Sequence, residues 1–167
     1  QTSPSQYSPA VVMFADGTFS LDPQVAFNWL SEGETATYEL AYRATDGLAS
    51  VPAIAYINIE GRNDAPTAED DIGFVTSKSR ILFVTAKKGL LVNDSDPDRI
   101  DRLIIDKFEG VTTKGAKYVV RSDGSFEYDP TESAILSGLL ENDLFVKDSF
   151  TYFVTDKAGA LSEATVK

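Results

Sequence analysis

The chain has 167 residues and a mass of 18.1 kDa, which suits one ordinary domain or a domain and a half. Its 26 acidic and 15 basic side chains leave a net charge of -11, which argues against binding to nucleic acid or to an anionic lipid surface. Cysteine and histidine are both absent, so disulfides, Cys/His zinc sites, cysteine nucleophiles and Ser-His-Asp hydrolases are excluded.

Short strands and tight turns are predicted along the first third of the chain. The apolar residues of 11–14 lead into Asp16-Gly17, a strong hairpin-turn signal, and then into a strand at 18–21. Residues 37–44 and 55–59 alternate between larger apolar and other side chains, the period-two pattern of a half-buried strand. The last third of the chain repeats these strand patterns at 118–120, 126–128 and 150–154. Helical turns are expected within 24–31 and 131–140, the second with Thr131 as its N-cap.

The most informative feature of the sequence is an internal repeat. Residues 15–23 and 122–130 share Asp-Gly, Phe and Asp-Pro, so that Asp16 aligns with Asp123. Residues 38–46 match 148–156 with Tyr42 aligned to Tyr152, so a three-residue insertion lies between the two blocks. A period of about 108 residues is the size of an immunoglobulin-like module. We therefore predict an all-β protein made of Greek-key β-sandwich modules in tandem.

The boundary between modules is expected where the strand pattern ends in turn residues and a proline, at 61–66. Residues 1–62 then form the C-terminal half of a first module, 63–66 a linker, and 67–167 a second, nearly complete module. Half a sandwich exposes an apolar face and open sheet edges. We therefore expect the chain to be a fragment of a longer tandem array, and a closed sheet formed by 1–62 alone would contradict this boundary.

The order of these motifs resembles the cadherin-like (VCBS-type) tandem repeats of large bacterial secreted and surface adhesins of the RTX type. The resemblance runs from about Val11 onward and rests on Asp-Gly-(Ser/Thr)-Phe, Ser-Phe-Thr-Tyr-x-Val-Thr-Asp at 149–156 and Asn-Asp-Ala-Pro at 63–66. Residues 91–98 are similar to the early loop of that family. The resemblance implies a secreted or cell-surface location, calcium-stiffened modules and no catalysis.

One loop concentrates acidic side chains that could bind a metal ion. Its four aspartates fall within eight positions: Asp94, Asp96, Asp98 and Asp101. Alternating aspartates place several carboxylates on one side of a loop, and hard oxygen ligands suit Ca²⁺. The loop is not an EF-hand, because Arg99 stands where that motif needs glycine and Ile105 where it needs glutamate. We predict Ca²⁺ binding here, with a solvated turn as the alternative.

The resemblance to cadherins implies a second calcium site at the module junction. There the family takes ligands from a glutamate of the preceding module, from the Asn-Asp linker and from an Asp-x-Asp loop. In this chain Glu32 or Glu34 could supply the first and Asn63 and Asp64 the second, and Asp94 follows Asp64 at the spacing that the family places between linker and loop. The match is incomplete because Gly61 and Ala65 replace further ligands and Pro66 comes one residue early, so a turn cap before the proline is the alternative.

These observations predict a non-catalytic extracellular spacer or adhesion module of a large repetitive protein, of the kind found in biofilms, with calcium as its partner. One alternative is a module that binds surface polysaccharide, with an exposed Trp29 as a sugar platform, although core packing of this ring is favoured. Another is a homophilic adhesin that binds a like module through an apolar patch. No pair of carboxylates stands out as catalytic. Since no run of 18 apolar residues occurs, we expect no membrane insertion.

Overall fold

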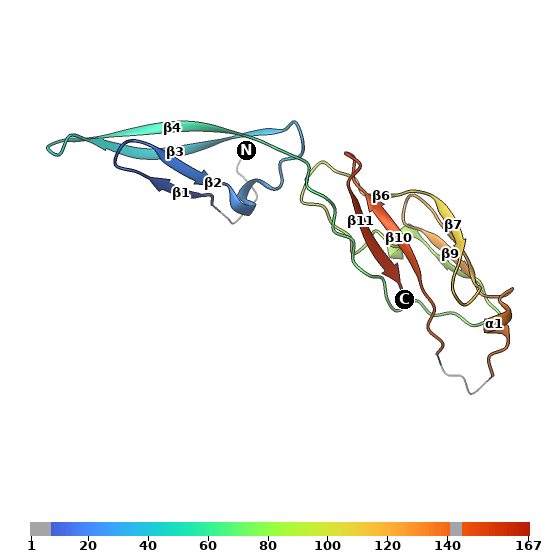
Figure 1. The fold of residues 1–167 in the computed structure, drawn as a ribbon. Coiled ribbons are helices and arrows are strands. Elements are labelled where there is room, and N and C mark those ends of the chain that lie inside the picture. The colour runs from blue at the N-terminus through green and yellow to red at the C-terminus, as the bar shows by residue number, and fades with distance from the viewer. Residues whose placement is uncertain (1–7, 141–144) are drawn as a thin grey trace. The chain divides into compact units, whose positions relative to one another are not determined.

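The computed structural model describes residues 8–140 and 145–167 and separates into two compact units (Figure 1). The first unit comprises the chain up to Asp64 together with Pro97–Ile100, and the second comprises Ala65–Asp96 together with Asp101–Lys167. Nearly all the regular structure is β, as predicted, with only short helical turns. No helix among the described residues is long and apolar enough to span a bilayer.

The first unit consists of two antiparallel hairpins joined by a helical turn. Strands β1 (Ala10–Met13) and β2 (Phe19–Asp22) pair through the predicted Asp-Gly turn, where Gly17 has a φ of 88° and the Asp16 carboxylate accepts hydrogen bonds from Thr18. The 3₁₀ turn η1 (Gln24–Phe27) follows. Strands β3 (Thr35–Thr45) and β4 (Ser50–Glu60) then form a long hairpin that is paired from Thr35↔Glu60 to Thr45↔Ser50.

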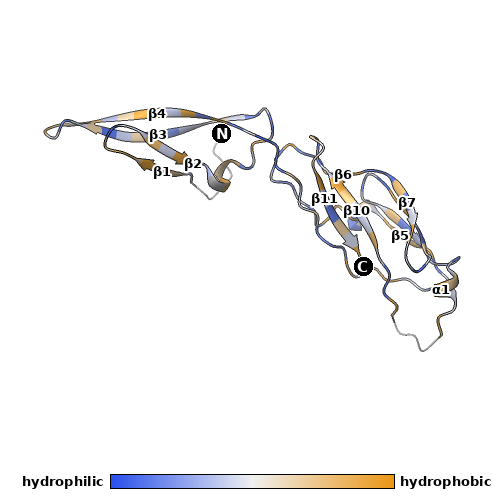
Figure 2. Ribbon diagram, in the orientation of Figure 1, coloured by the Kyte–Doolittle hydropathy of each residue, from blue (hydrophilic) through white to orange (hydrophobic). Residues whose placement is uncertain are grey.

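The core of the first unit is small. Ala26, Leu30 and Leu40 are buried, and Phe27 packs edge-to-face on Tyr38 with ring centroids 6.4 Å apart. From position 41 to the end of β3 every residue is exposed, so the alternation predicted for this strand holds only in its first half. Figure 2 shows that hydrophobic residues lie along β1, β2 and β4 of this unit. The first unit therefore has hairpins of regular register but little buried apolar surface.

The second unit contains two antiparallel sheets. The larger sheet has the order β5-β9-β8-β7, from β5 (Leu82–Val84), β7 (Phe108–Val111), β8 (Lys117–Val120) and β9 (Phe126–Asp129). The smaller sheet has the order β11-β10-β6, from β6 (Ile104–Ile105), β10 (Phe150–Thr155) and β11 (Leu161–Val166). Two helical turns, η2 (Ala86–Lys88) and α1 (Ala134–Ser137), lie in the connections.

The segment after the linker is fastened to the last strand. Asp71 forms a parallel bridge with Val166, in which the Asp71 N–H donates to the Thr165 carbonyl at 3.0 Å and the Lys167 N–H donates to the Asp71 carbonyl at 2.9 Å. The Thr165 N–H also donates to the Asp70 carboxylate at 2.9 Å. The beginning and the end of the second unit therefore run side by side in the same direction.

A single hydrophobic core lies between the two sheets of the second unit. One sheet contributes Val84, Val120 and Phe126, and the other contributes chiefly Ile105, Phe150, Tyr152, Val154, Ala164 and Val166. The rings of Tyr118 and Phe150 stack with centroids 4.3 Å apart, which joins the sheets directly. Residues from both sheets in one buried cluster define a β-sandwich.

The helical turn in the second unit begins later than predicted. Ser133, not Thr131, is the N-cap of α1, and its hydroxyl accepts the Leu136 N–H at 3.0 Å. The Thr131 hydroxyl donates instead to the Asp129 carboxylate at 2.6 Å, in a turn that the Asp-Pro dipeptide starts. Both residues are short and polar, and Ser133 also donates a hydrogen bond to the Lys114 carbonyl.

Candidate metal centre

Strand pairing in the second unit brings together three aspartates that are distant in sequence. Asp156 follows β10 directly, and Asp101 lies just before β6. Because β6 pairs antiparallel with the end of β10, through Val154↔Ile105 and Thr155↔Ile104, these two aspartates come to the same end of the sheet. The third aspartate, Asp96, directly follows Ser95, which forms an antiparallel β-bridge with Thr67. One carboxylate oxygen from each of the three lies within 4.8 Å of the other two.

The geometry of this cluster suits a divalent cation with oxygen ligands. Two oxygens that bind the same ion at about 2.4 Å lie at most about 4.8 Å apart. The distances between one carboxylate oxygen of each of the three aspartates are all within this limit of 4.8 Å. Asp156 is only 3% exposed, and its Oδ1 accepts the Ala160 N–H at 2.8 Å, which fixes the carboxylate at the cluster. Ca²⁺ takes six to eight oxygen ligands or so in flexible geometry, so backbone carbonyls and water could complete the shell.

A second acidic group in the same unit surrounds a buried tyrosine. The Tyr152 hydroxyl is 2.7 Å from Asp71 Oδ2 and 3.4 Å from Asp94 Oδ2, and Tyr152 has no exposed surface. Burial raises the pKa of Asp71 to about 6, against the lowering effect of the Tyr152 hydrogen bond. Burial also raises the pKa of Asp94 and that of Tyr152. Asp94 is half-buried, and its Oδ1 accepts the Glu69 N–H at 2.9 Å.

The remaining predicted ligands lie in the first unit. Asp98 is 2% exposed, and its Oδ2 accepts the Asp64 N–H at 2.9 Å. The Asn63 side-chain amide donates to the carbonyl of Asp64 at 3.0 Å. The linker and the aspartate loop therefore meet at Asp98, through the backbone amide of Asp64, whereas the spacing pointed to Asp94.

The two predicted glutamate ligands differ in their surroundings. Glu34 forms an ion pair with Arg99, with Oε1 2.6 Å from Nη2, and this hydrogen bond lowers the pKa of Glu34. Its other oxygen accepts the Ser31 N–H at 3.2 Å. Glu32 lies exposed in the turn before β3. A metal ion at Glu34 would have to replace the guanidinium of Arg99.

The four aspartates predicted as one site thus lie in three different environments. Asp96 and Asp101 share the cluster with Asp156, Asp94 lies beside Tyr152, and Asp98 accepts from the linker. Sequence reasoning did not select Asp156, although a signal existed. Both copies of the repeat end their strand with Thr-Asp, at Asp46 and at Asp156, and a carboxylate kept at one position in both copies could have marked it.

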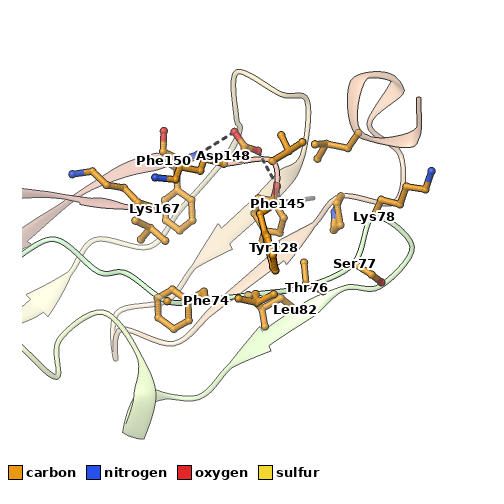
Figure 3. Close-up of a pocket in the computed structure, with 18 of the residues that line it drawn as sticks. Phe74, Thr76, Ser77, Lys78, Leu82, Tyr128, Phe145, Asp148, Phe150 and Lys167 are labelled. Carbon is orange, nitrogen blue, oxygen red and sulfur yellow. Dashed lines mark hydrogen bonds between the residues drawn. The ribbon is translucent and has the colours of Figure 1, made fainter. Parts of the chain in front are cut away.

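The second unit also contains an apolar cavity of 930 Å³ (Figure 3). Its lining includes Phe74, Leu82, Phe145 and Phe150, and the Tyr128 hydroxyl there donates to the Asp148 carboxylate at 2.8 Å. Burial raises the pKa of Tyr128, so the hydroxyl keeps its proton. Phe145 directly follows residues 141–144, which are outside the described part of the chain.

Trp29 does not form a free sugar platform. Its ring is partly buried, its Nε1–H donates to the Ala26 carbonyl at 3.0 Å, and the Arg99 guanidinium lies 4.5 Å from the ring centroid. This ring is therefore held within the first unit, in keeping with the preference for a packing role.

Comparison with known proteins identifies the family. The model of the bacterial cadherin-like domain matches residues 63–167, which covers the second unit and its linker. No curated protein and no solved structure shows significant similarity to the chain. Cadherin-like domains are generally non-catalytic modules of adhesion or spacing, and a β-sandwich with an acidic cluster beside its loops agrees with that assignment. The chain therefore belongs to the bacterial cadherin-like domain family.

Proposed function

We propose that this chain is a non-catalytic spacer or adhesion module of a larger extracellular protein, and that Ca²⁺ bound by Asp96, Asp101 and Asp156 stiffens it. The observation that carries the proposal is the convergence of these three carboxylates from separate segments, with one oxygen of each within 4.8 Å of the others. Hard carboxylate oxygens are the ligands that Ca²⁺ prefers.

The position of the cluster explains how an ion would add stiffness. Strand β6 has only two residues, so strand pairing does little to hold Asp101 beside β10. An ion shared with Asp156 would tie Asp96 and Asp101 to the end of β10, in the way that a cross-link restrains a loop. Glu34 is left out of the proposed ligand set because Arg99 already neutralises its charge.

The test is thermal unfolding of the chain in excess Ca²⁺, in excess Mg²⁺ and in EDTA. A ligand at 100 times its Kd stabilises the folded state by about 2.7 kcal/mol, which for a unit of this size raises Tm by roughly 10 °C or more. We expect this rise with Ca²⁺ and a much smaller one with Mg²⁺, which demands regular octahedral geometry.

The repeat supplies a matched control for the ligand variant. Asp156→Asn keeps an oxygen that can accept the Ala160 N–H but removes the charge, and it should abolish the Ca²⁺-dependent rise. Asp46→Asn makes the same change at the corresponding position of the first unit, where Oδ1 accepts the N–H groups of Leu48 and Ala49. It should leave the rise intact. Superimposable curves in Ca²⁺ and EDTA for the unmodified chain would refute the calcium proposal.

A further inference from the structure

The first unit includes a short segment from the middle of the aspartate loop. Residues Pro97–Ile100 belong to it, whereas Asp96 and Asp101 on either side belong to the second unit. The structure describes all four residues, and none of them takes part in a strand or a β-bridge. Only Asp98 is buried, and Ile100 is 51% exposed. Neither strand pairing nor apolar burial holds this segment, so its polar contacts with the rest of the first unit must do so.

Arg99 contacts two side chains of the first unit. Its Nη2 lies 2.6 Å from Glu34 Oε1, and its guanidinium carbon lies over the Trp29 ring, 4.5 Å from the centroid. Its backbone N–H also points to the Trp29 carbonyl, at 3.4 Å. A guanidinium can pair with a carboxylate through its edge while its face lies on an aromatic ring. Arg99 makes both contacts, and it therefore anchors the segment.

The two side chains that the guanidinium contacts are held in place by the first unit itself. The indole N–H of Trp29 donates to the Ala26 carbonyl at 3.0 Å. The backbone N–H of Glu34 donates to the Ser31 carbonyl at 2.9 Å, and the Glu34 carbonyl accepts the Gly61 N–H at 2.8 Å. The ring and the carboxylate are therefore positioned without help from the aspartate loop, and together they present a preformed site for a cation.

The chemistry of this site decides which cation it takes. An aromatic face attracts a guanidinium but offers no oxygen ligand to Ca²⁺, which takes about six to eight oxygens. Both carboxylate oxygens of Glu34 are already engaged, one by Arg99 and the other by the Ser31 N–H at 3.2 Å. Arg99 is also part of the same chain, so its effective concentration at the site is high. The site thus suits the guanidinium better than a metal ion.

We infer that Arg99 is a built-in cation that docks Pro97–Ile100 on the first unit through Glu34 and Trp29, whereas the family resemblance offers Glu34 to a junction Ca²⁺. The docking therefore needs no metal ion and persists when metal ions are removed. The inference does not depend on the proposed calcium site, whose ligands Asp96 and Asp101 flank the docked segment.

The test is hydrogen–deuterium exchange of single amides, followed by NMR on the full chain in EDTA. The Asp64 N–H reports the docking, because its acceptor is the Asp98 carboxylate at 2.9 Å. The Gly61 N–H is the internal control, because its acceptor, the Glu34 carbonyl, lies outside the segment. We expect Arg99→Gln to speed exchange at Asp64 by roughly fivefold or more and to leave exchange at Gly61 unchanged.

Further variants test whether the ion pair carries the docking. Arg102→Gln removes the same charge nearby, in the second unit, and should leave exchange at Asp64 unchanged. Glu34→Gln should act like Arg99→Gln, and the double variant should be no faster than either single one, since all three break the same ion pair. Arg99→Gln should also raise acrylamide quenching of Trp29, the single tryptophan, because the ring loses its covering guanidinium.

Three outcomes would overturn the inference. Unchanged exchange at Asp64 in Arg99→Gln would mean that other contacts dock the segment. Additive effects of the two substitutions would mean that Arg99 and Glu34 act separately. Protection of Asp64 that the unmodified chain shows only after Ca²⁺ is added would assign the docking to a metal ion. A missing Ca²⁺-dependent rise in Tm, in contrast, would refute the calcium proposal alone.

Discussion

The buried hydroxyl of Tyr152 is the contact whose removal has the most clearly calculable effect. Tyr152→Phe leaves the ring in the core and removes the hydrogen bond of 2.7 Å to Asp71. A hydrogen bond to a charged group is worth about 1.5–3 kcal/mol, whereas one between neutral groups is worth about 1 kcal/mol. We expect the variant to lose about 2 kcal/mol of the free energy of unfolding at pH 8, where Asp71 is charged.

The pH dependence of this loss follows from the pKa of Asp71. That pKa is raised to about 6 by burial and is held down in part by the Tyr152 hydroxyl, so the variant should have a still higher value. A carboxyl whose folded pKa lies above its unfolded value loses stability as pH rises through that range. The difference between variant and parent should therefore be smaller at pH 4.5 than at pH 8.

Urea denaturation followed by far-UV circular dichroism measures this difference in EDTA. For a slope of about 1–2 kcal/mol per molar urea, a loss of about 2 kcal/mol lowers the midpoint by about 1–2 M. Fluorescence of Trp29, the single tryptophan, reports the first unit and should keep its transition. Tyr42→Phe is the matched control and should cost less than about 0.5 kcal/mol. A loss below that value for Tyr152→Phe at pH 8, or an equal loss at both pH values, would refute the reasoning.

Three further changes test other features of the second unit. In urea titrations the parent should lose up to about 3 kcal/mol of stability as pH rises from about 4 to about 6, because Asp71 becomes charged while buried. Asp71→Asn should remove much of this loss. If the variant loses as much stability over this pH range, other groups are responsible. Gly89→Ala should cost about 2–3 kcal/mol by denaturation because a Cβ there would lie 2.2 Å from the Gly124 carbonyl oxygen, and a neutral result would mean that the backbone moves freely. Ser133→Ala removes both the cap of α1 and the hydrogen bond to the Lys114 carbonyl, and it should cost about 1–2 kcal/mol, seen as a Tm several degrees lower. An unchanged Tm would mean that the cap adds nothing to stability.

Local chemistry made the β architecture predictable. The Asp-Gly turns, the period-two strands and the repeat each depend on neighbouring residues, and the hairpin around Gly17 and the strand at 126–129 formed as expected. The family assignment confirms the sandwich class that these signals indicated. Turns and strands, which depend on neighbouring residues, could therefore be predicted from one sequence.

The distribution of the aspartates could not be predicted in the same way. Asp94, Asp96 and Asp98 alternate in sequence, but their surroundings are set by three different long-range contacts, with Tyr152, Asp156 and Asp64. The decisive contact for Asp101 is the β6–β10 pairing, which involves only two residue pairs and has no strong sequence signal. Spacing along a loop indicates what carboxylates could do together, whereas tertiary pairing decides which of them meet.

The parallel bridge between Asp71 and Val166 has a mechanical consequence for a module that works under tension. Force applied to the two ends of the second unit would enter through the segment at Asp71 and leave through β11. Because these segments lie side by side and point in the same direction, pulling them apart slides one along the other, across the direction of their hydrogen bonds. The bonds at Asp71, Thr165 and Lys167 would then bear the load together and fail together, not one after another as in an unzipping hairpin. Such an arrangement favours a spacer that stays folded until a threshold force and then opens abruptly.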